Sequence, residues 1–196
     1  MKIKNLASLV LATGLAGCSS MPIVGDNIHR VAPGVYRSAQ LDIKDDLKEF
    51  IKDKKIDHYI TLRGPNRLTS KEKEVCESYG VKYHVFTFSA RYPPNREELI
   101  RLANLFSELN NSGERFAFHC NFGSDRSGMA EAVYHMIKGK SVDDSIERSF
   151  RLRQGYLGIG LTQAPLDFIE SYKPYENKIS FKEWLYRNYQ NEIVSK

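Results

Sequence analysis

Residues 116–128 read FAFHCNFGSDRSG and carry the strongest structural signal in the chain. The stretch opens with Phe116-Ala117-Phe118, a short apolar run typical of a buried strand. A Gly-containing loop follows, and then a helix from about Ser127 to Ile137. A strand that passes through a short loop into a helix is the repeating unit of α/β proteins. In such proteins, ligands bind beyond the carboxyl ends of the strands.

The loop after this strand has the residues for a nucleophile that faces a bound anion. Cys120 ends the strand, and Arg126 lies six positions later. Backbone N–H groups that curl inward and the positive end of the next helix would hold an anion, and Gly123 permits the tight turn. We expect Cys120 to be a thiolate near neutral pH, Arg126 to grip two phosphoryl oxygens, and Ser127 to donate to the departing sulfur. The predicted phosphate-binding residues are Asn121, Phe122, Gly123, Ser124, Asp125 and Arg126.

Strand-like and helix-like segments alternate outside this loop. The predicted strands span 35–37, 57–62 and 81–88, and the apolar spacing of 43–51 indicates a helix. Four further helices should begin at capping pairs. In each pair, the side chain of the first residue can accept a hydrogen bond from the backbone N–H of the second residue, three positions later. These pairs are Thr69 with Glu72, Asn95 with Glu98, Ser141 with Asp144, and Ser180 with Glu183. We therefore predict a single α/β domain whose central, mostly parallel sheet is flanked by helices.

Residues 119–128 resemble the His-Cys-(x)5-Arg-(Ser/Thr)-Gly signature of cysteine-dependent protein-tyrosine and dual-specificity phosphatases. Residues 35–40, VYRSAQ, are similar to the opening of small phosphatases of this type, including exported bacterial ones. Residues 60–63, ITLR, resemble their strand ending in Leu-Arg, and Pro93-Pro94 before a helix also fits. The resemblance covers about residues 28–150. It implies a phosphatase that works through a phosphocysteine, with Cys120 as nucleophile and no cofactor.

The sequence departs from this family at the general acid. The resemblance implies an Asp on a loop before the Cys strand, but residues 87–95, TFSARYPPN, contain no acid, and Ala90 stands at the expected position. General acid catalysis contributes about 10²–10⁴ in rate, so the absence matters. Asp125 is the leading replacement, and Glu97 and Glu98 are weaker ones. A phosphate-binding protein without turnover is the alternative, and a sulfurtransferase is disfavoured by the 35–40 motif.

The substrate is left open by the sequence. Phosphotyrosine, or phosphoserine and phosphothreonine, in proteins is the first expectation, and inositol phosphates or phosphoinositides are the alternative. Four side chains could form the rim of the site, as could residues 151–154. They are Arg63, Arg67, Arg91 and Tyr92.

The first seventeen residues have the pattern of an export signal. Lys2 and Lys4 precede a short apolar stretch, and residues 15–18, LAGC, resemble the lipobox of bacterial lipoproteins. This resemblance implies cleavage before Cys18, lipid modification of Cys18, and a membrane anchor; Ser19 in place of Asp favours the outer membrane and the periplasm. We predict a signal over 1–17, a tether over 18–27, and a phosphatase domain over 28–196 with a C-terminal helix near 180–190.

Composition excludes several other classes. With 196 residues, 41% hydrophobic and 27% charged, the chain has the composition of a globular domain. The net charge of +5 falls to +3 without the two signal lysines and is too dispersed to indicate nucleic-acid binding. Three cysteines exclude a disulfide scaffold, although Cys76 could form a regulatory bridge with Cys120. The histidines lack metal-ligand spacing, so we expect no metal.

Overall fold

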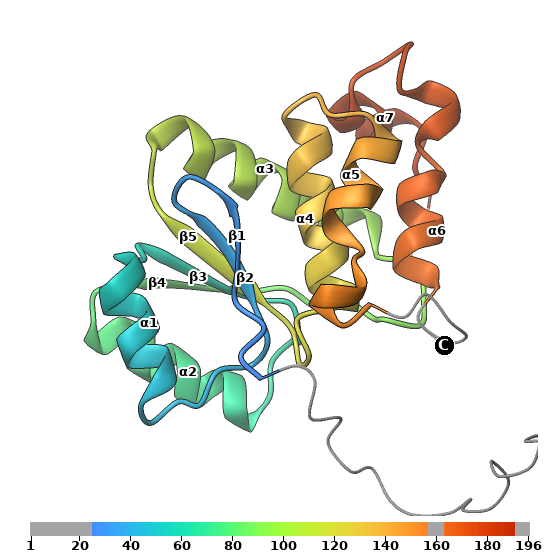
Figure 1. Cartoon of the computed structure of the whole chain (residues 1–196). Helices are drawn as coiled ribbons and strands as arrows, with labels where there is room; N and C mark the ends of the chain where they lie inside the picture. The colour runs from blue at the N-terminus through green and yellow to red at the C-terminus, as the bar shows by residue number, and fades with distance from the viewer. Residues whose placement is uncertain (1–24, 157–162, 191–196) are drawn as a thin grey trace, which may run out of the picture.

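Five strands form the centre of the molecule, in the order β1-β2-β5-β3-β4 (Figure 1). The structure is a computed structural model that describes residues 25–156 and 163–190. β1 and β2 pair antiparallel, whereas β2 with β5, β5 with β3, and β3 with β4 pair parallel. The predicted mostly parallel sheet is therefore confirmed. The strands are β1 (His29–Ala32), β2 (Val35–Ser38), β3 (His58–Thr61), β4 (Lys82–Val85) and β5 (Phe116–His119).

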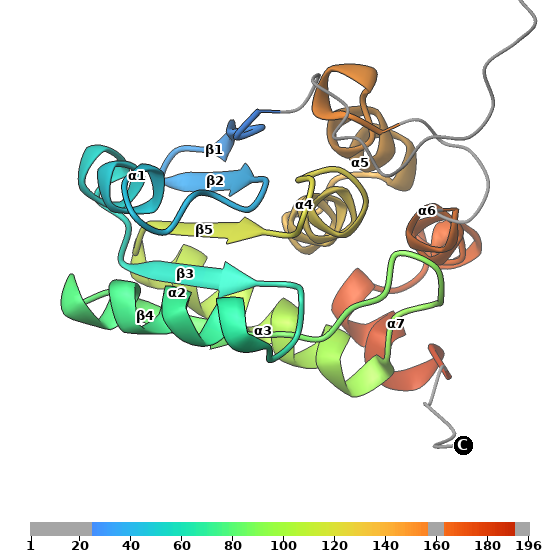
Figure 2. The ribbon, with the colours of Figure 1, turned by 90° about the horizontal axis from the view of Figure 1, so that it is seen from below.

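Helices cover both faces of the sheet, as Figure 2 shows from below. In the described residues they are α1 (Asp46–Lys54), α2 (Arg67–Ser78), α3 (Arg96–Ser112), α4 (Asp125–Ile137), α5 (Val142–Ser149), α6 (Ala164–Glu170) and α7 (Phe181–Arg187). Two short 3-10 segments, η1 (Leu152–Gln154) and η3 (Lys173–Tyr175), lie in the C-terminal part. The predicted single α/β domain is confirmed.

The alternation of side chains along β5 divides the core into two clusters. Phe116 and Phe118 point to one face, where they pack with α3, α4, α6 and α7. Ala117 points to the other face and packs with residues of α1 and α2. All three are fully buried, so β5 is covered on both sides, as its continuous apolar sequence predicts.

Three of the four predicted caps are confirmed. Asn95, Ser141 and Ser180 each accept a hydrogen bond from a backbone N–H three residues later, at 3.1–3.2 Å. The Thr69–Glu72 pair is wrong as the start of a helix. The cap of α2 is Asn66, whose side chain accepts from the N–H groups of Leu68 and Thr69, while the Thr69 hydroxyl accepts from the Asn66 N–H.

Other boundaries differ from the sequence-based ones by a few residues. α4 begins at Asp125, two residues before the predicted start, because the loop after β5 runs straight into the helix. The strand predicted over 81–88 is limited to β4, four residues long. The sequence patterns did not predict β1 or α6. β1 pairs only with β2, at the edge of the sheet, and has a register irregularity.

The parallel strands bring four loops to one edge of the sheet. The N–H of Gln40, after β2, donates to the carbonyl oxygen of Asn121, after β5, at 3.1 Å. The N–H of Leu62, after β3, donates to the carbonyl oxygen of His119 at 2.9 Å. This edge therefore holds the segments that the sequence analysis selected, as expected for the carboxyl ends of parallel strands.

Candidate active site

The loop that follows β5, here called the Cys120 loop (residues 120–126), forms the centre of this edge. Cys120 is 2% exposed and lies directly after β5. Asp125 and Arg126 already belong to the first turn of α4. The structure therefore brings all the sequence-predicted residues of this loop to one place, at the junction of a strand and a helix.

The first two carbonyl groups of the loop are held by donors outside it. The carbonyl oxygen of Asn121 accepts from the backbone N–H of Gln40 at 3.1 Å. The carbonyl oxygen of Phe122 accepts from the side-chain amide of Asn27 at 2.8 Å. Both carbonyl groups thus point away from the centre of the loop.

The next two carbonyl groups are held by one fully buried arginine. Nη2 of Arg37, on β2, donates to the carbonyl oxygen of Gly123 and, at 3.2 Å, to that of Ser124. Nη1 of the same side chain donates to the carboxylate of Glu131 and, at 2.7 Å, to the carbonyl oxygen of Ser149. The carboxylate of Glu131 compensates the buried charge of Arg37, and Arg37 together with His135 lowers the pKa of Glu131 despite its burial.

The outward carbonyl groups determine where the N–H groups of the loop point. In a trans peptide the C=O of one residue and the N–H of the next point in opposite directions. Because the carbonyl groups of residues 121–124 point outward, the N–H groups of residues 122–125 point toward the centre of the loop. The N-terminal end of α4 adds its positive dipole at the same point. This arrangement is a cradle for an anion beside the Cys120 thiol.

Gly123 is required at its position by both backbone and space. Its φ of 71° lies in the left-handed region that side chains rarely adopt. An added Cβ would lie 2.7 Å from the Ala39 nitrogen and 2.8 Å from both the Ser38 carbonyl carbon and the Asn27 amide nitrogen. The close approach of the Cys120 loop to the end of β2 therefore depends on this glycine.

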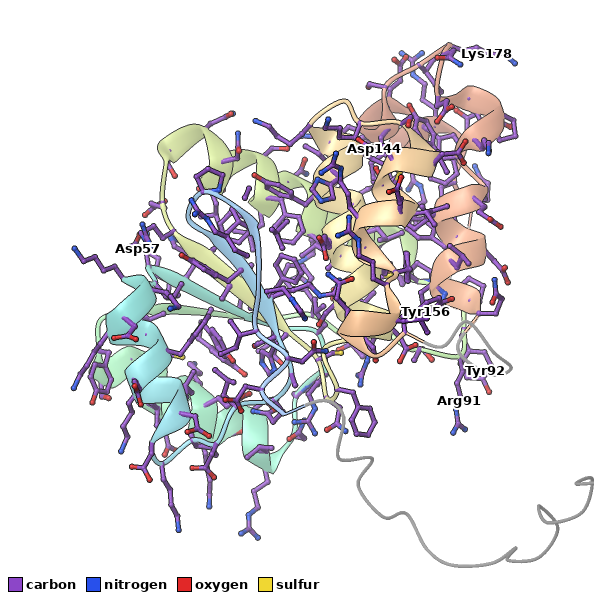
Figure 3. The ribbon with its side chains drawn as sticks, viewed as in Figure 1. Asp57, Arg91, Tyr92, Asp144, Tyr156 and Lys178 are labelled. Carbon is purple, nitrogen blue, oxygen red and sulfur yellow. The ribbon has the colours of Figure 1, made fainter. Side chains whose placement is uncertain are left out.

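An open cleft of about 600 Å³ lies next to Arg126. Its other wall is the segment 87–95, which includes Phe88, Pro93 and Pro94. Arg91 and Tyr92 also line it, and Figure 3 shows both side chains projecting from the end of the molecule. The cleft thus offers apolar and aromatic surface next to a guanidinium group.

The predicted rim residues divide between three places. Arg91 and Tyr92 line the cleft, whereas Arg63 donates to the side chain of Gln40. Arg67 is an exposed residue at the start of α2. Among residues 151–154, Leu152 is 76% exposed.

The cleft wall that should carry the general acid carries none among its described residues. Ala90 lines the cleft, as the sequence predicts for this position. Glu98 does not line the cleft: its carboxylate accepts from the N–H of Thr87, at the end of this wall, at 3.1 Å and pairs with Arg101. Glu97 is exposed on α3 and does not line the cleft. Neither of the two weaker candidates therefore lines the cleft beside Arg126.

Asp125 is half-buried at the start of α4, next to Arg126 in the chain. It accepts a hydrogen bond from the Ser124 hydroxyl at 3.3 Å. Burial raises the pKa of Tyr156, and the charge of Asp125 contributes to the same shift. The Tyr156 hydroxyl is buried without a hydrogen-bond partner in the described residues. Asp125 thus has a neutral phenol in its vicinity, which the sequence analysis missed.

Ser127 is fully buried in α4, behind the Cys120 loop. Its hydroxyl donates to the carbonyl oxygen of Ser38 at 3.4 Å, a long hydrogen bond that a small rotation would break. The role of this hydroxyl at the Cys120 sulfur stays a prediction.

The side chain of His119 is fully buried next to Cys120. Its Nδ1 lies 3.3 Å from the carbonyl oxygen of Cys120, and its ring stacks on Tyr59 at 4.9 Å. Nε2 lies 3.5 Å from the carboxylate of Glu72. Burial lowers the pKa of His119 although the Glu72 charge opposes the shift, so the ring is neutral at pH 7. This environment fits a residue that shapes the loop.

Glu72 is a functional-site neighbour that sequence reasoning missed. Its fully buried carboxylate accepts from the Tyr83 hydroxyl at 2.8 Å and from the side-chain amide of Gln40. Gln40 in turn accepts from Arg63. The local pattern assigned Glu72 to a helix cap, and only the packing of α2 against the sheet places it beside His119.

The structure does not contain the bridge considered between Cys76 and Cys120; both thiols are free. Cys76 belongs to the cluster under α1 and α2, whereas Cys120 belongs to the cluster on the opposite face. Burial, with the nearby charge of Glu72, raises the pKa of Cys76 to about 12. Cys76 is therefore protonated and unreactive at neutral pH.

The predicted signal over 1–17, the predicted lipidation site Cys18 and most of the predicted tether lie outside the described residues. The last tether residues are described, and they contact the site. The carbonyl oxygen of Asp26 accepts from the N–H of Ala39 at 2.8 Å, and Asn27 holds Phe122. The chain thus enters the fold beside the Cys120 loop (Figure 1).

The residues that the structure describes contain no group of three His, Cys, Asp or Glu side chains that could hold a metal ion. None of their helices is long and apolar enough to span a bilayer.

No protein-family model matches the sequence, and a comparison with curated proteins found no match either. Solved structures with a similar fold do exist. The crystal structure of P. aeruginosa TpbA superposes with a TM-score of 0.62 at 13% identity, over 77% of this chain and 91% of that chain. Another TpbA structure is a complex with pTyr.

Two further solved structures are similar to about the same degree. The core catalytic domain of the S. cerevisiae PP-IP phosphatase SIW14 matches with a TM-score of 0.61 at 19% identity, over 80% of this chain and 91% of that chain. PTPMT1 in complex with PI(5)P matches with a TM-score of 0.60 at 18% identity, over 78% and 97%. This chain therefore has the same mostly parallel α/β fold as TpbA, SIW14 and PTPMT1.

Proposed function

We propose that this protein is a phosphomonoester hydrolase that works through a phosphocysteine intermediate. The single observation that carries the proposal is the Cys120 loop, whose outward carbonyl groups aim four N–H groups at one point beside a buried thiol. A phosphoryl group bound there would lie against Cys120, with Arg126 on its open side.

The proposed reaction has two displacements at phosphorus. The Cys120 thiolate forms an S–P bond while the P–O bond to the substrate breaks, and the leaving oxygen takes a proton. Water then forms a new P–O bond, loses a proton, and the S–P bond breaks to return the thiolate, with Ser127 donating to the sulfur. Inward N–H groups and Arg126 stabilise the equatorial charge in both steps.

Asp125 is the proposed proton donor and acceptor. It lies beside Arg126 in the chain, and the cleft wall 87–95 has no acid. The Asp125→Asn variant should lose about 10²-fold or more on a phosphotyrosine peptide and much less on para-nitrophenyl phosphate, whose leaving group needs little protonation. Asp143→Asn, at an exposed acid in the first turn of α5, is the matched control. Equal rates for the wild type and Asp125→Asn would contradict this assignment.

Phosphotyrosine in proteins is the proposed substrate class, with phosphoserine and phosphothreonine next. The cleft beside Arg126 has Phe88, Tyr92 and two prolines in its walls, which suits an aromatic ring. The fold likeness to TpbA, solved with pTyr, supports the same class.

An inositol phosphate or phosphoinositide is the second candidate. Arg91 lines the cleft together with Arg126, and a polyphosphorylated ring could contact both guanidinium groups. The PP-IP phosphatase SIW14 and PTPMT1, solved with PI(5)P, have the same fold.

A phosphate-binding protein without turnover is the third candidate. The observation that favours it is the absence of a carboxylate from the cleft wall 87–95. Such a protein would keep the cradle around Cys120 and would bind phosphoryl groups without releasing phosphate.

The deciding experiment is hydrolysis of para-nitrophenyl phosphate and a phosphotyrosine peptide by the full-length chain under reducing conditions. Cys120→Ser is the control, because it removes the nucleophile and keeps the loop. Hydrolysis of both substrates, lost in Cys120→Ser, is the expected result. If neither substrate is turned over and Cys120→Ser still binds the phosphopeptide, the protein is a phosphate-binding protein and the proposed phosphatase activity is wrong.

We also propose that the chain is an exported lipoprotein, anchored through Cys18 in a bacterial membrane and more specifically the outer membrane, with its site in the periplasm. The support is the 15–18 motif and the basic and apolar segments before it. Fractionation of cells that produce the wild type and Cys18→Ala tests this. Equal membrane association of the two proteins would overturn the lipid anchor.

A further inference from the structure

A second pocket of about 340 Å³ lies behind the Cys120 loop, between β1, α4, α5 and η1. It is separate from the cleft at Arg126, with which it shares no lining residue. Six polar side chains of its wall matter here: Arg30, Glu131, His135, Arg148, Arg151 and Gln154. We propose that this pocket is a second binding site for a phosphate-sized oxyanion.

The charge of the pocket favours an anion. Three guanidinium groups, from Arg30, Arg148 and Arg151, meet a single carboxylate in the lining. That carboxylate, Glu131, is 5% exposed and already paired with the fully buried Arg37. Asp144 lies outside the lining and pairs with Arg148, so Arg30 and Arg151 leave the wall with more positive than negative charge.

The arginines have donors that can turn toward a ligand. Within the described residues, each of the three guanidinium groups donates hydrogen bonds from Nε alone. Arg30 donates to the carbonyl oxygen of Ala32, Arg148 to Asp144, and Arg151 to the carbonyl oxygen of Glu147. Their planar terminal amino groups match the oxygens of a tetrahedral anion.

Buried polar groups form the floor of the pocket. His135 is 8% exposed, and its Nε2 lies 3.5 Å from Glu131. Gln154 is 2% exposed, and its side-chain oxygen accepts from the N–H of Arg151. Buried polar side chains beside arginine guanidinium groups are the arrangement of a binding site that is largely preformed.

Two hydrogen-bonded connections join this pocket to the Cys120 loop. One runs from Glu131 through Arg37 to the carbonyl oxygens of Gly123 and Ser124. The other runs from the carbonyl oxygen of Gln154 through the side chain of Asn27. An anion that moves Glu131 or Gln154 therefore acts on groups that orient the loop, and the two sites should influence each other reciprocally.

Binding is tested with inorganic phosphate on the full-length Cys120→Ser/Arg126→Met variant, in which the proposed catalytic site is disabled. Calorimetric titration at low ionic strength should show one saturable phosphate per chain. Adding Arg148→Gln and Arg151→Gln should weaken that binding at least 10-fold. The matched control is Arg187→Gln, since Arg187 also pairs with an acid one helical turn earlier, on α7. The charge-retaining pair Arg148→Lys/Arg151→Lys should recover part of the affinity.

Absence of saturable binding in Cys120→Ser/Arg126→Met would overturn the site, as would an equal loss in the Arg187→Gln control. Because the catalytic site is disabled in this background, the result stands whether or not the protein is a phosphatase. The connection to the loop rests on the proposed function. If the pocket acts on the loop, added phosphate should change the kcat of the wild type at saturating substrate and leave the kcat of Arg148→Gln/Arg151→Gln unchanged. A wild-type kcat that does not depend on phosphate would overturn the connection.

Discussion

Arg37 donates through Nη2 to the carbonyl oxygen of Gly123, and this bond joins β2 to the middle of the Cys120 loop. The same side chain pairs with Glu131 on α4, so one guanidinium group connects a strand, the loop and the following helix. The sequence motif 35–40 ends 79 positions before the loop motif 119–128 begins, yet the two form one hydrogen-bonded unit.

Removing the Arg37 side chain should separate stability from activity. Arg37→Met leaves the buried Glu131 without its arginine partner, with only His135 beside it, and should cost about 3–5 kcal/mol of unfolding free energy. The double variant Arg37→Met/Glu131→Leu removes both buried charges and should recover most of the lost unfolding free energy. Its kcat/KM should stay on the order of 10²-fold below that of the wild type, because the carbonyl groups of the Cys120 loop still lack their donor. Urea unfolding and hydrolysis of para-nitrophenyl phosphate measure the two effects. Full activity in the double variant would show that Arg37 serves stability alone.

Gly123→Ala should distort the loop, whereas Gly139→Ala should not. Both glycines have positive φ, 71° and 78°, so both variants carry a backbone cost of about 1–2 kcal/mol. Only Gly123 has backbone atoms within 3 Å of the new Cβ, while Gly139 has open space. Affinity of the Cys120→Ser protein for a phosphotyrosine peptide, measured by calorimetry in each background, should therefore fall about 10-fold or more for Gly123→Ala only. A similar affinity in both would mean that the loop tolerates the methyl group.

Cys76 should resist oxidation and alkylation in the folded protein. Its pKa of about 12 and complete burial leave almost no accessible thiolate at pH 8. Iodoacetamide should label Cys76 only after unfolding in urea, as mapped by mass spectrometry of the digested chain. After peroxide treatment of the native protein, a peptide with Cys76 and Cys120 joined would contradict the placement of the two thiols on opposite faces of the sheet.

The half-buried His84 should make the protein less stable in acid. Burial, and the nearby charges of His58, Lys82 and Arg101, lower its pKa from 6.5 to about 4. The unfolded chain therefore binds more protons than the folded chain between these values, so this contribution is complete above pH 6.5 and is lost as pH falls toward 4.

The variant His84→Gln removes this titrating group, together with its hydrogen bond to His58. The loss of unfolding free energy between pH 7 and pH 4.5 should be smaller in His84→Gln than in the wild type, by roughly 1–2 kcal/mol after allowance for solvent screening. Urea unfolding at the two pH values measures it. Equal losses in the two proteins would mean that His84 titrates normally in the fold.

Local patterns in the sequence predicted the α/β class and the mostly parallel sheet. Apolar runs such as Phe116–Phe118 specify buried strands, and Asn95, Ser141 and Ser180 mark helix starts, because a strand pattern and a cap each depend on neighbours within a few residues. The position of residues 120–126 could be predicted for the same reason, because the local sequence alone places them between a strand and a helix.

The sequence by itself determined the strand, the loop, the helix and the identity of the residues between them. The tertiary structure decided what orients that loop. In the sequence, Glu131 is one more polar residue of a helix, Asn27 belongs to the predicted tether, and Glu72 belongs to a predicted cap. Only the packing of the elements places Glu131 beside Arg37 and Asn27 beside Phe122. The same packing places Glu72 beside His119. The reason is physical: a buried polar group must find its partner wherever the fold brings one, and no local pattern records a partner that lies dozens of residues away.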